Sequence, residues 1–160
     1  MPAMAKHDPV REQLALLLDW SHAHVSFDDA IRAMPVALRG RRPRGLHSVW
    51  EQVEHIRLCQ RDILDFCRDK DYAEKKWPDD YWPASPLPRG ASAWTQAVAA
   101  YRRDRKAFQR LAADTKLDLF AAIPHGTGQT YLREILLAAD HAAYHIGQIV
   151  AVRRSLGIWP

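Results

Sequence analysis

The chain has 160 residues, of which 48% are hydrophobic and 26% charged, a composition typical of a globular protein that buries a substantial core. The formal net charge is only +4 and the basic residues are spread along the chain, so we do not expect a nucleic-acid-binding protein. There is no 18-residue apolar run and no secretory signal pattern, which predicts a cytoplasmic protein without a membrane span. The length predicts a single domain, residues 1–160, with its core between about residues 10 and 156.

The spacing of the apolar residues is helical almost everywhere, which predicts an all-α protein. The first helix is expected from about Asp8 to Ala23, and a short helical piece is expected at Phe27–Met34. After a loop rich in Arg, Gly and Pro, Ser48 and Glu51 form an S-x-x-E capping box that begins the second long helix. This helix is expected to end near Cys67.

A Pro-rich stretch without periodicity follows at residues 70–91, which predicts a long ordered loop. The third long helix is expected from Ser92, as its N-cap, to about Ala113. The turn-rich stretch IPHGTGQT leads to the last helix, Tyr131 to about Leu156, which Gly157 is expected to end. Four long helices joined by long connections predict a four-helix bundle.

The last helix contains the stretch HAAYHIGQI, in which His141 and His145 are four residues apart. This spacing places both imidazoles on one face of a helix, about 40° and about 6 Å apart. Glu134 and Gln148 fall on the same face, so the pair belongs to a polar stripe whose buried groups need partners. Bundles build metal sites from side chains on facing helices, and His55, in the middle of the second long helix, is the best candidate for a third ligand.

Two other side chains are candidate ligands. Cys59 lies one turn after His55, and its thiol could bind zinc, although a buried, inert, reduced thiol is the simpler interpretation. His24, near the end of the first helix, is the other candidate. Glu51 and Glu134 are candidate bases by their helical positions, but capping or supporting roles fit them better, so no catalytic residue is assigned.

The pair in HAAYHIGQIVAVRRSLGIW, together with His55 in HSVWEQVEHIRLCQRDIL, resembles the DinB-like (YfiT-like) family of metal-binding four-helix bundles, which is distinct from the DNA polymerase of that name. The resemblance covers about residues 10–156, and H-x3-H-x-G-Q is its most specific part. It implies that His55, His141 and His145 bind one divalent ion, most often nickel or zinc. Ile146 stands where many members carry an arginine, so any role of that arginine is absent.

The resemblance also implies an activity, a metal-dependent thiol transferase or hydrolase that acts on a small molecule, with a low-molecular-weight thiol as co-substrate in the transferase. It implies a homodimer as well, which would fit the nearly all-round apolar last helix. The alternative is a non-catalytic metal-binding or stress-associated protein. A nucleic-acid partner is the least favoured interpretation, since a solvated loop accounts for the basic cluster that suggests it. The cluster consists of Arg39, Arg41, Arg42 and Arg44.

Overall fold

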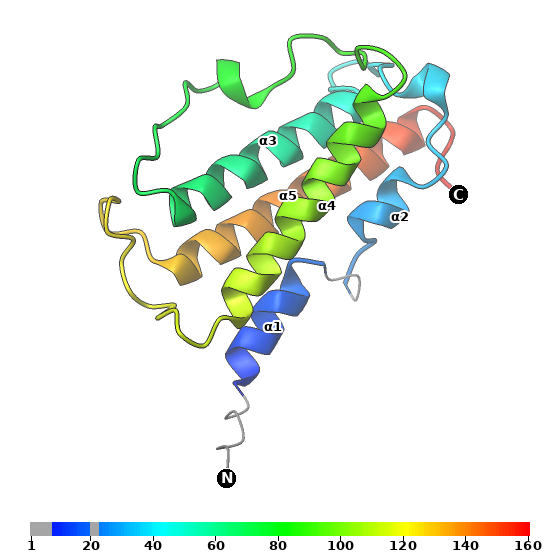
Figure 1. The fold of residues 1–160 in the computed structure, drawn as a ribbon. Coiled ribbons are helices and arrows are strands. Elements are labelled where there is room, and N and C mark those ends of the chain that lie inside the picture. The colour runs from blue at the N-terminus through cyan, green and yellow to red at the C-terminus, as the bar shows by residue number, and fades with distance from the viewer. Residues whose placement is uncertain (1–7, 20–22) are drawn as a thin grey trace.

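The structure, a computed structural model, describes residues 8–19 and 23–160, and this part of the chain folds into five α-helices without a β-strand. The helices are α1 (Pro9–Leu17), α2 (Phe27–Ile31), α3 (Val49–Arg68), α4 (Ala93–Ala113) and α5 (Tyr131–Ser155), with short 3-10 helices η1 (Val36–Leu38) and η2 (Asp79–Tyr81) in the connections. α3 packs against both α4 and α5, while α1 packs on α4 (Figure 1). The predicted all-α bundle with long connections is confirmed.

The first helix is shorter than predicted. Asp8 caps α1, because its Oδ1 accepts hydrogen bonds from the backbone N–H groups of Val10 and Arg11. The helix ends at Leu17, and neither the turn at residues 18–19 nor Ala23 is helical, so the predicted continuation to Ala23 is wrong. Residues 20–22 lie outside the described residues. A carboxylate near a helix C-terminus interacts unfavourably with the helix dipole. The carboxylate of Asp19 forms an ion pair of 2.7 Å with Arg105 of α4.

The long helices begin with different caps. The predicted capping box of α3 is present, with Ser48 Oγ accepting from the Glu51 N–H and the Ser48 N–H donating to the Glu51 carboxylate. Ser92 does occupy the N-cap position of α4, but its side chain makes no capping hydrogen bond, contrary to the prediction. Thr130 caps α5, and Gly157, with a φ of 69°, follows its end as predicted.

The buried apolar side chains form two clusters along the bundle. The first includes Phe27, Val49, Val53, Ile56, Tyr101, Ile149 and Val152, and the second includes Leu14, Leu64, Phe108, Leu119, Ile123 and Ile135. On α5, His141 lies between Ala139 of the second cluster and Ala142 of the first. The histidine pair therefore lies near the junction of the two clusters, at the contact between α3 and α5.

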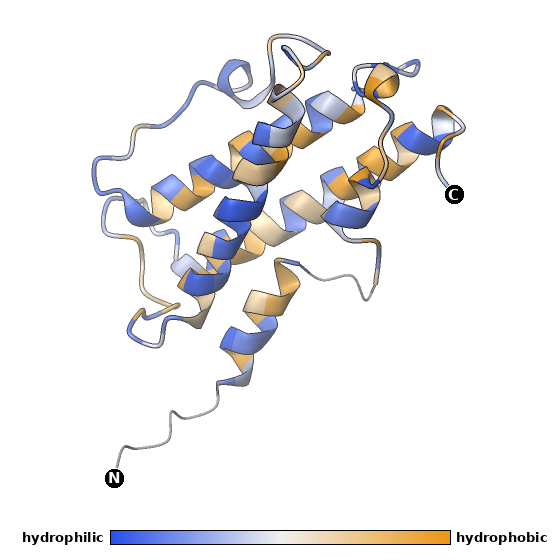
Figure 2. Cartoon of the chain, turned by 45° about the vertical axis from the view of Figure 1, so that its right-hand side comes forward, coloured by the Kyte–Doolittle hydropathy of each residue, from blue (hydrophilic) through white to orange (hydrophobic). Residues whose placement is uncertain are grey.

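The connection between α3 and α4 runs along the outer side of α3 (Figure 1). As predicted, it has no long element, and its short helix η2 contacts α3. Figure 2 shows hydrophilic residues along much of α4, in keeping with a helix that has one solvated face. Because η2 contacts α3, the connection can cover residues in the middle of α3.

By length and composition alone, α5 would be able to cross a membrane. Half of its most apolar window is buried inside the fold, where α5 packs on α3. The core helix of a bundle meets the same criterion, because burial on several sides requires the same apolar composition as contact with lipid. The length and apolarity of α5 are thus accounted for by its place in the core.

Candidate metal centre

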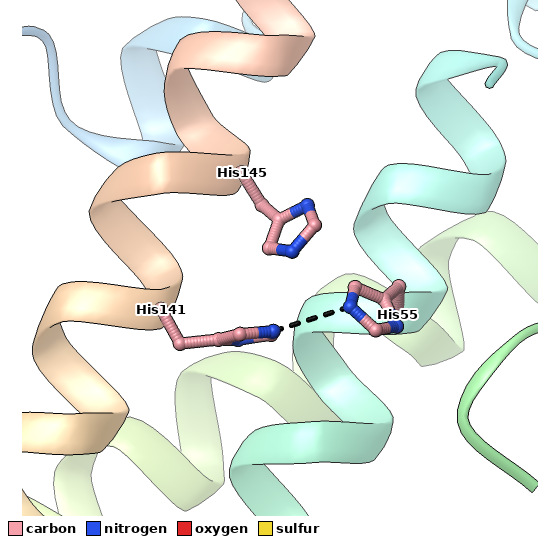
Figure 3. Close-up of side chains that lie close together, drawn as sticks. All are labelled: His55, His141 and His145. Carbon is pink, nitrogen blue, oxygen red and sulfur yellow. Dashed lines mark hydrogen bonds between the residues drawn. The ribbon is translucent and has the colours of Figure 1, made fainter. Parts of the chain in front are cut away.

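Three histidines from two helices converge in the interior of the bundle. His55 projects from α3 towards His141 and His145 of α5 (Figure 3). One nitrogen from each ring can be chosen so that all three lie within 4.8 Å of one another, and the Nε2 atoms of His55 and His141 are 3.1 Å apart. His55 and His145 are 2% and 8% exposed, while His141 is half-buried. The structure thus brings together the three residues predicted as ligands.

Helix geometry explains why two of these rings lie together. His141 and His145 are separated by four residues, so their side chains lie one turn apart on the face of α5 that contacts α3. Their ring centroids are 4.5 Å apart, and the His55 ring lies 4.9 Å from His141 and 4.4 Å from His145. To bring His55 to this pair, α3 must also pack against α5 in the right register. The two apolar clusters, one on each side of the histidines, hold that register.

Hydrogen bonds to neighbouring groups orient two of the rings. His145 Nδ1 lies 2.7 Å from Oε1 of Gln52, and His55 Nδ1 lies 2.7 Å from the backbone carbonyl oxygen of Tyr81. Both oxygens are acceptors, so each Nδ1 carries the proton and each Nε2 keeps its lone pair. This arrangement is the one that metal-bound histidines usually have, with the second ring nitrogen donating to an oxygen.

The surroundings keep the imidazoles neutral. Burial lowers the pKa of His55 below the usual value of 6.5. Burial lowers the pKa of His141 to about 4, with a further contribution from His55, and it lowers the pKa of His145 to about 3, with contributions from the other two rings. A neutral imidazole is the form that binds a metal, so protons compete weakly for these nitrogens near neutral pH.

An aromatic side chain from the α3–α4 connection covers the site. The Trp82 ring stacks on His55 with centroids 3.8 Å apart and planes 6° apart, and it also stacks on His47 at 4.1 Å and meets His145 edge-on at 6.1 Å. Trp77 meets the edge of His55 at 6.4 Å but is itself 65% exposed. The Pro-rich connection, predicted as a long ordered loop, therefore shields one face of His55 from solvent.

The two alternative ligands differ from the three histidines. Cys59 Sγ lies 3.6 Å from Nδ1 of His55, but burial raises the pKa of its thiol to about 12, which disfavours the thiolate that a metal requires. His24 is exposed, and its Nδ1 lies 2.8 Å from the carbonyl oxygen of Val25. Within the described residues, the group of side chains able to hold a metal consists of the three histidines.

Two predicted acidic candidates are engaged in ion pairs. Glu51 is buried and binds the guanidinium of Arg42, in addition to its role in the capping box. Glu134 is buried and paired with Arg133. Arg39, from the same basic cluster as Arg42, lies over the Trp94 ring at 4.5 Å. Supporting roles therefore account for both carboxylates, and two arginines of the basic cluster contribute to the fold.

Replacement of Glu51 by glutamine is expected to lower the free energy of unfolding by about 2 kcal/mol without weakening metal binding, because it removes charged hydrogen bonds at the start of α3. Burial alone would raise the pKa of Glu51, but hydrogen bonds from Arg42 and Ser48 lower it to about 2. The stabilisation is therefore present above pH 4.5 and is lost as the pH falls towards 2. Urea unfolding of the wild type and the variant across this range measures the difference. Glu54→Gln, which breaks the nearby pair with Arg57 and leaves the capping box intact, is the control for the loss of one carboxylate from α3.

Replacement of Gln52 by leucine is expected to weaken metal binding about tenfold, because His145 loses the acceptor that fixes its tautomer. Competition with a chromophoric chelator measures the affinity. Gln60→Leu is a matched control, because Gln60 is also a buried glutamine of α3 but donates to the Tyr101 carbonyl, away from the histidines. Equal affinities for the Gln52 and Gln60 variants would show that Gln52 does not support the site.

Three residues that contact the histidines were not predicted as part of the site: Gln52, Tyr81 and Trp82. For Gln52 a local signal existed, because it lies three residues before His55 and so shares its side of α3. No comparable signal exists for the other two, because their approach to His55 depends on the path of an irregular connection.

Comparison with known families gives one match. A family model described as the DinB superfamily matches residues 19–149, which is most of the chain. No curated protein and no solved structure matches the chain. The match agrees with the all-α bundle and with the resemblance seen in the H-x3-H-x-G-Q motif. The chain therefore belongs to the DinB superfamily.

Proposed function

We propose that the protein binds one divalent metal ion, nickel or zinc, through His55, His141 and His145. The observation that carries the proposal is the convergence of three buried or half-buried imidazoles, with nitrogens within 4.8 Å, from two helices. Buried polar groups need partners, and a shared ion would bind one nitrogen of each ring. An all-nitrogen donor set of neutral imidazoles suits nickel and zinc better than magnesium or calcium, which prefer oxygen.

We further propose that the site catalyses the transfer of a low-molecular-weight thiol to a small electrophile, or a related hydrolysis. A bound divalent ion would supply Lewis acidity and would lower the pKa of a thiol or water held beside it. The protein's own residues contribute orientation and exclusion of solvent: Gln52 and the Tyr81 carbonyl hold two rings, and Trp82 covers His55. Half-buried His141 marks the side from which a small molecule would approach.

A non-catalytic metal-binding role is the second candidate. It is favoured by the near-complete burial of His55 and His145 and by the stacked cover of Trp82, which leave little room around these two rings. The candidate base Glu51 is also held in an ion pair with Arg42. In this role the ion would stabilise the contact between α3 and α5 instead of activating a substrate.

Elemental analysis after reconstitution with nickel, zinc or manganese tests the proposal. The expected result is about one nickel or zinc ion retained per chain after gel filtration, and a wild type that retains none of the three would contradict it. The loaded protein is then given a thiol and a panel of electrophiles, and loss of free thiol is followed. Metal retention without turnover would favour the non-catalytic role.

We also propose a homodimer. α5 exposes Leu136, Leu137 and Tyr144, and α1 exposes Leu16 and Leu17, so apolar side chains of two helices lie at the surface. Leu17 and Leu136 line one cavity, so these two leucines of the two helices lie near each other. A second copy of the chain would remove these side chains from water.

Replacement of Leu136 by glutamate is expected to convert the dimer to a monomer, because it places a charge in the proposed contact. Sedimentation equilibrium measures the mass. Leu87→Glu, at another exposed leucine in the α3–α4 connection, is the control and should leave the dimer intact. A monomeric wild type at micromolar concentration would refute the homodimer.

A further inference from the structure

Asp62 is a buried carboxylate on α3, seven residues and therefore about two turns after His55 on the same side of the helix. Its Oδ2 accepts a hydrogen bond of 2.7 Å from the hydroxyl of Tyr81, and the hydroxyl of Tyr72 lies 3.2 Å from Oδ1. The ammonium group of Lys75 lies 3.6 Å from Oδ1. All three partners belong to the connection that follows α3, so one carboxylate holds this connection at three points.

Because the Asp62 carboxylate is buried, it requires hydrogen-bond donors from the protein. A carboxylate removed from water is costly unless donors surround it, and the two phenols and the ammonium group provide these donors. Burial and the charge of Asp62 raise the pKa of Tyr72 to about 12 and also raise the pKa of Tyr81. Both phenols therefore keep their protons at neutral pH and act as donors. The connection is held on α3 by charge-assisted hydrogen bonds as well as by apolar contact.

Tyr81 joins this anchor to the candidate metal centre. Its hydroxyl binds Asp62, while its backbone carbonyl accepts the hydrogen bond from Nδ1 of His55 at 2.7 Å. The next residue, Trp82, stacks on the His55 ring at 3.8 Å. The position of Tyr81 thus sets the position of the carbonyl oxygen that accepts from His55 and of the Trp82 ring that stacks on it.

We propose that Asp62 is a positioning residue for the metal centre, and that it acts through Tyr81 to hold His55 in the tautomer with its proton on Nδ1. The effect on metal affinity rests on the proposed function, but the effect on the His55 tautomer does not. Without the anchor, the Tyr81 carbonyl would no longer be fixed opposite Nδ1, and the proton would distribute over both ring nitrogens. The Nε2 lone pair that faces the other histidines would then be available for only part of the time.

Tyr81→Phe and Asp62→Asn test this proposal, with Tyr72→Phe as the matched control. Tyr72 also donates to Asp62, but its backbone carbonyl is not the acceptor for His55. The first readout is the ¹⁵N chemical shifts of the His55 ring in the metal-free protein, which report the tautomer. The second is the affinity for zinc by chelator competition, and thermal unfolding shows that each variant is folded.

In the wild type, the His55 ring should be protonated at Nδ1. In Tyr81→Phe and Asp62→Asn, the two ¹⁵N shifts should move towards each other as the tautomers mix, and zinc affinity should fall about tenfold. Tyr72→Phe should leave both unchanged. Unchanged shifts in folded Tyr81→Phe and Asp62→Asn, or an equal effect in Tyr72→Phe, would overturn the role of Asp62. If the wild type binds no zinc while the shifts move as expected, the positioning role stands and the metal proposal fails.

Discussion

Replacement of His145 by alanine is expected to lower the affinity for nickel or zinc by about 100-fold or more. A zinc site of four ligands gains about 10–16 kcal/mol of binding free energy, so that each ligand accounts for about 3 kcal/mol. His145 is buried, and its Nδ1 is held by Gln52. The same loss is expected for His55→Ala and His141→Ala. Competition with a chelator of known affinity measures it for each protein.

Two controls accompany this series. His24→Ala removes an exposed histidine that was a candidate ligand, and it should leave the affinity unchanged. Cys59→Ser removes the thiol beside His55 and should have little effect, because the high pKa of this thiol disfavours metal binding. Retention of wild-type affinity by the His145 variant would refute the three-histidine site, and loss of affinity in Cys59→Ser would add the thiol to it.

The metal-free protein is expected to lose stability as the pH falls below 6.5. In the folded state the pKa of His141 is about 4 and that of His145 about 3, and the pKa of His55 is also lowered. Since these values lie below the ordinary 6.5, the unfolded chain takes up protons first. The contribution to stability is complete above pH 6.5 and is lost progressively as the pH falls towards 4 and 3. Each proton taken up on unfolding gives a slope of about 1.4 kcal/mol per pH unit.

Urea unfolding of the metal-free protein between pH 7.5 and 5 measures this slope. The control is the double variant His141→Gln, His145→Gln, which keeps polar side chains on the same face but removes two titrating groups, and its stability should vary less with pH. Saturation with zinc should raise stability most near neutral pH and progressively less in acid, because protons and the ion compete for the same nitrogens. A wild type whose stability is constant from pH 7 to 5 would show that the histidines are not held neutral by burial.

The parts of the site that the sequence predicts most directly depend on local spacing. The four-residue separation of His141 and His145 fixes their common face wherever a helix forms, and the S-x-x-E pattern fixes the start of α3 in the same way. Local spacing does not select His55 as the third ligand. That prediction also uses the rule that bundles build sites from inward side chains of facing helices. His55 lies on the side of α3 that faces α5, which places it beside His141.

The failures also have physical causes. The first helix ends at Leu17, and Asp19 just after it pairs with Arg105 of α4, a contact between residues that are far apart in the sequence. Ser92 is a common capping residue by type, yet its backbone is in the right-handed helical region instead of the extended conformation usual for an N-cap, and its side chain does not cap. Residue type sets a preference, but the path of the preceding chain decides whether the cap forms.

By itself, the sequence determined the helical class, the long helices and the histidine face of α5, because these follow from repeated spacing of apolar and polar residues within one segment. The tertiary structure alone decided what surrounds His55. Tyr81 and Trp82 lie in a connection without periodicity, and they reach His55 because Asp62 anchors that connection along α3. Contacts of this kind depend on how an irregular segment folds back over a helix, and the spacing of residues along the sequence does not predict that path.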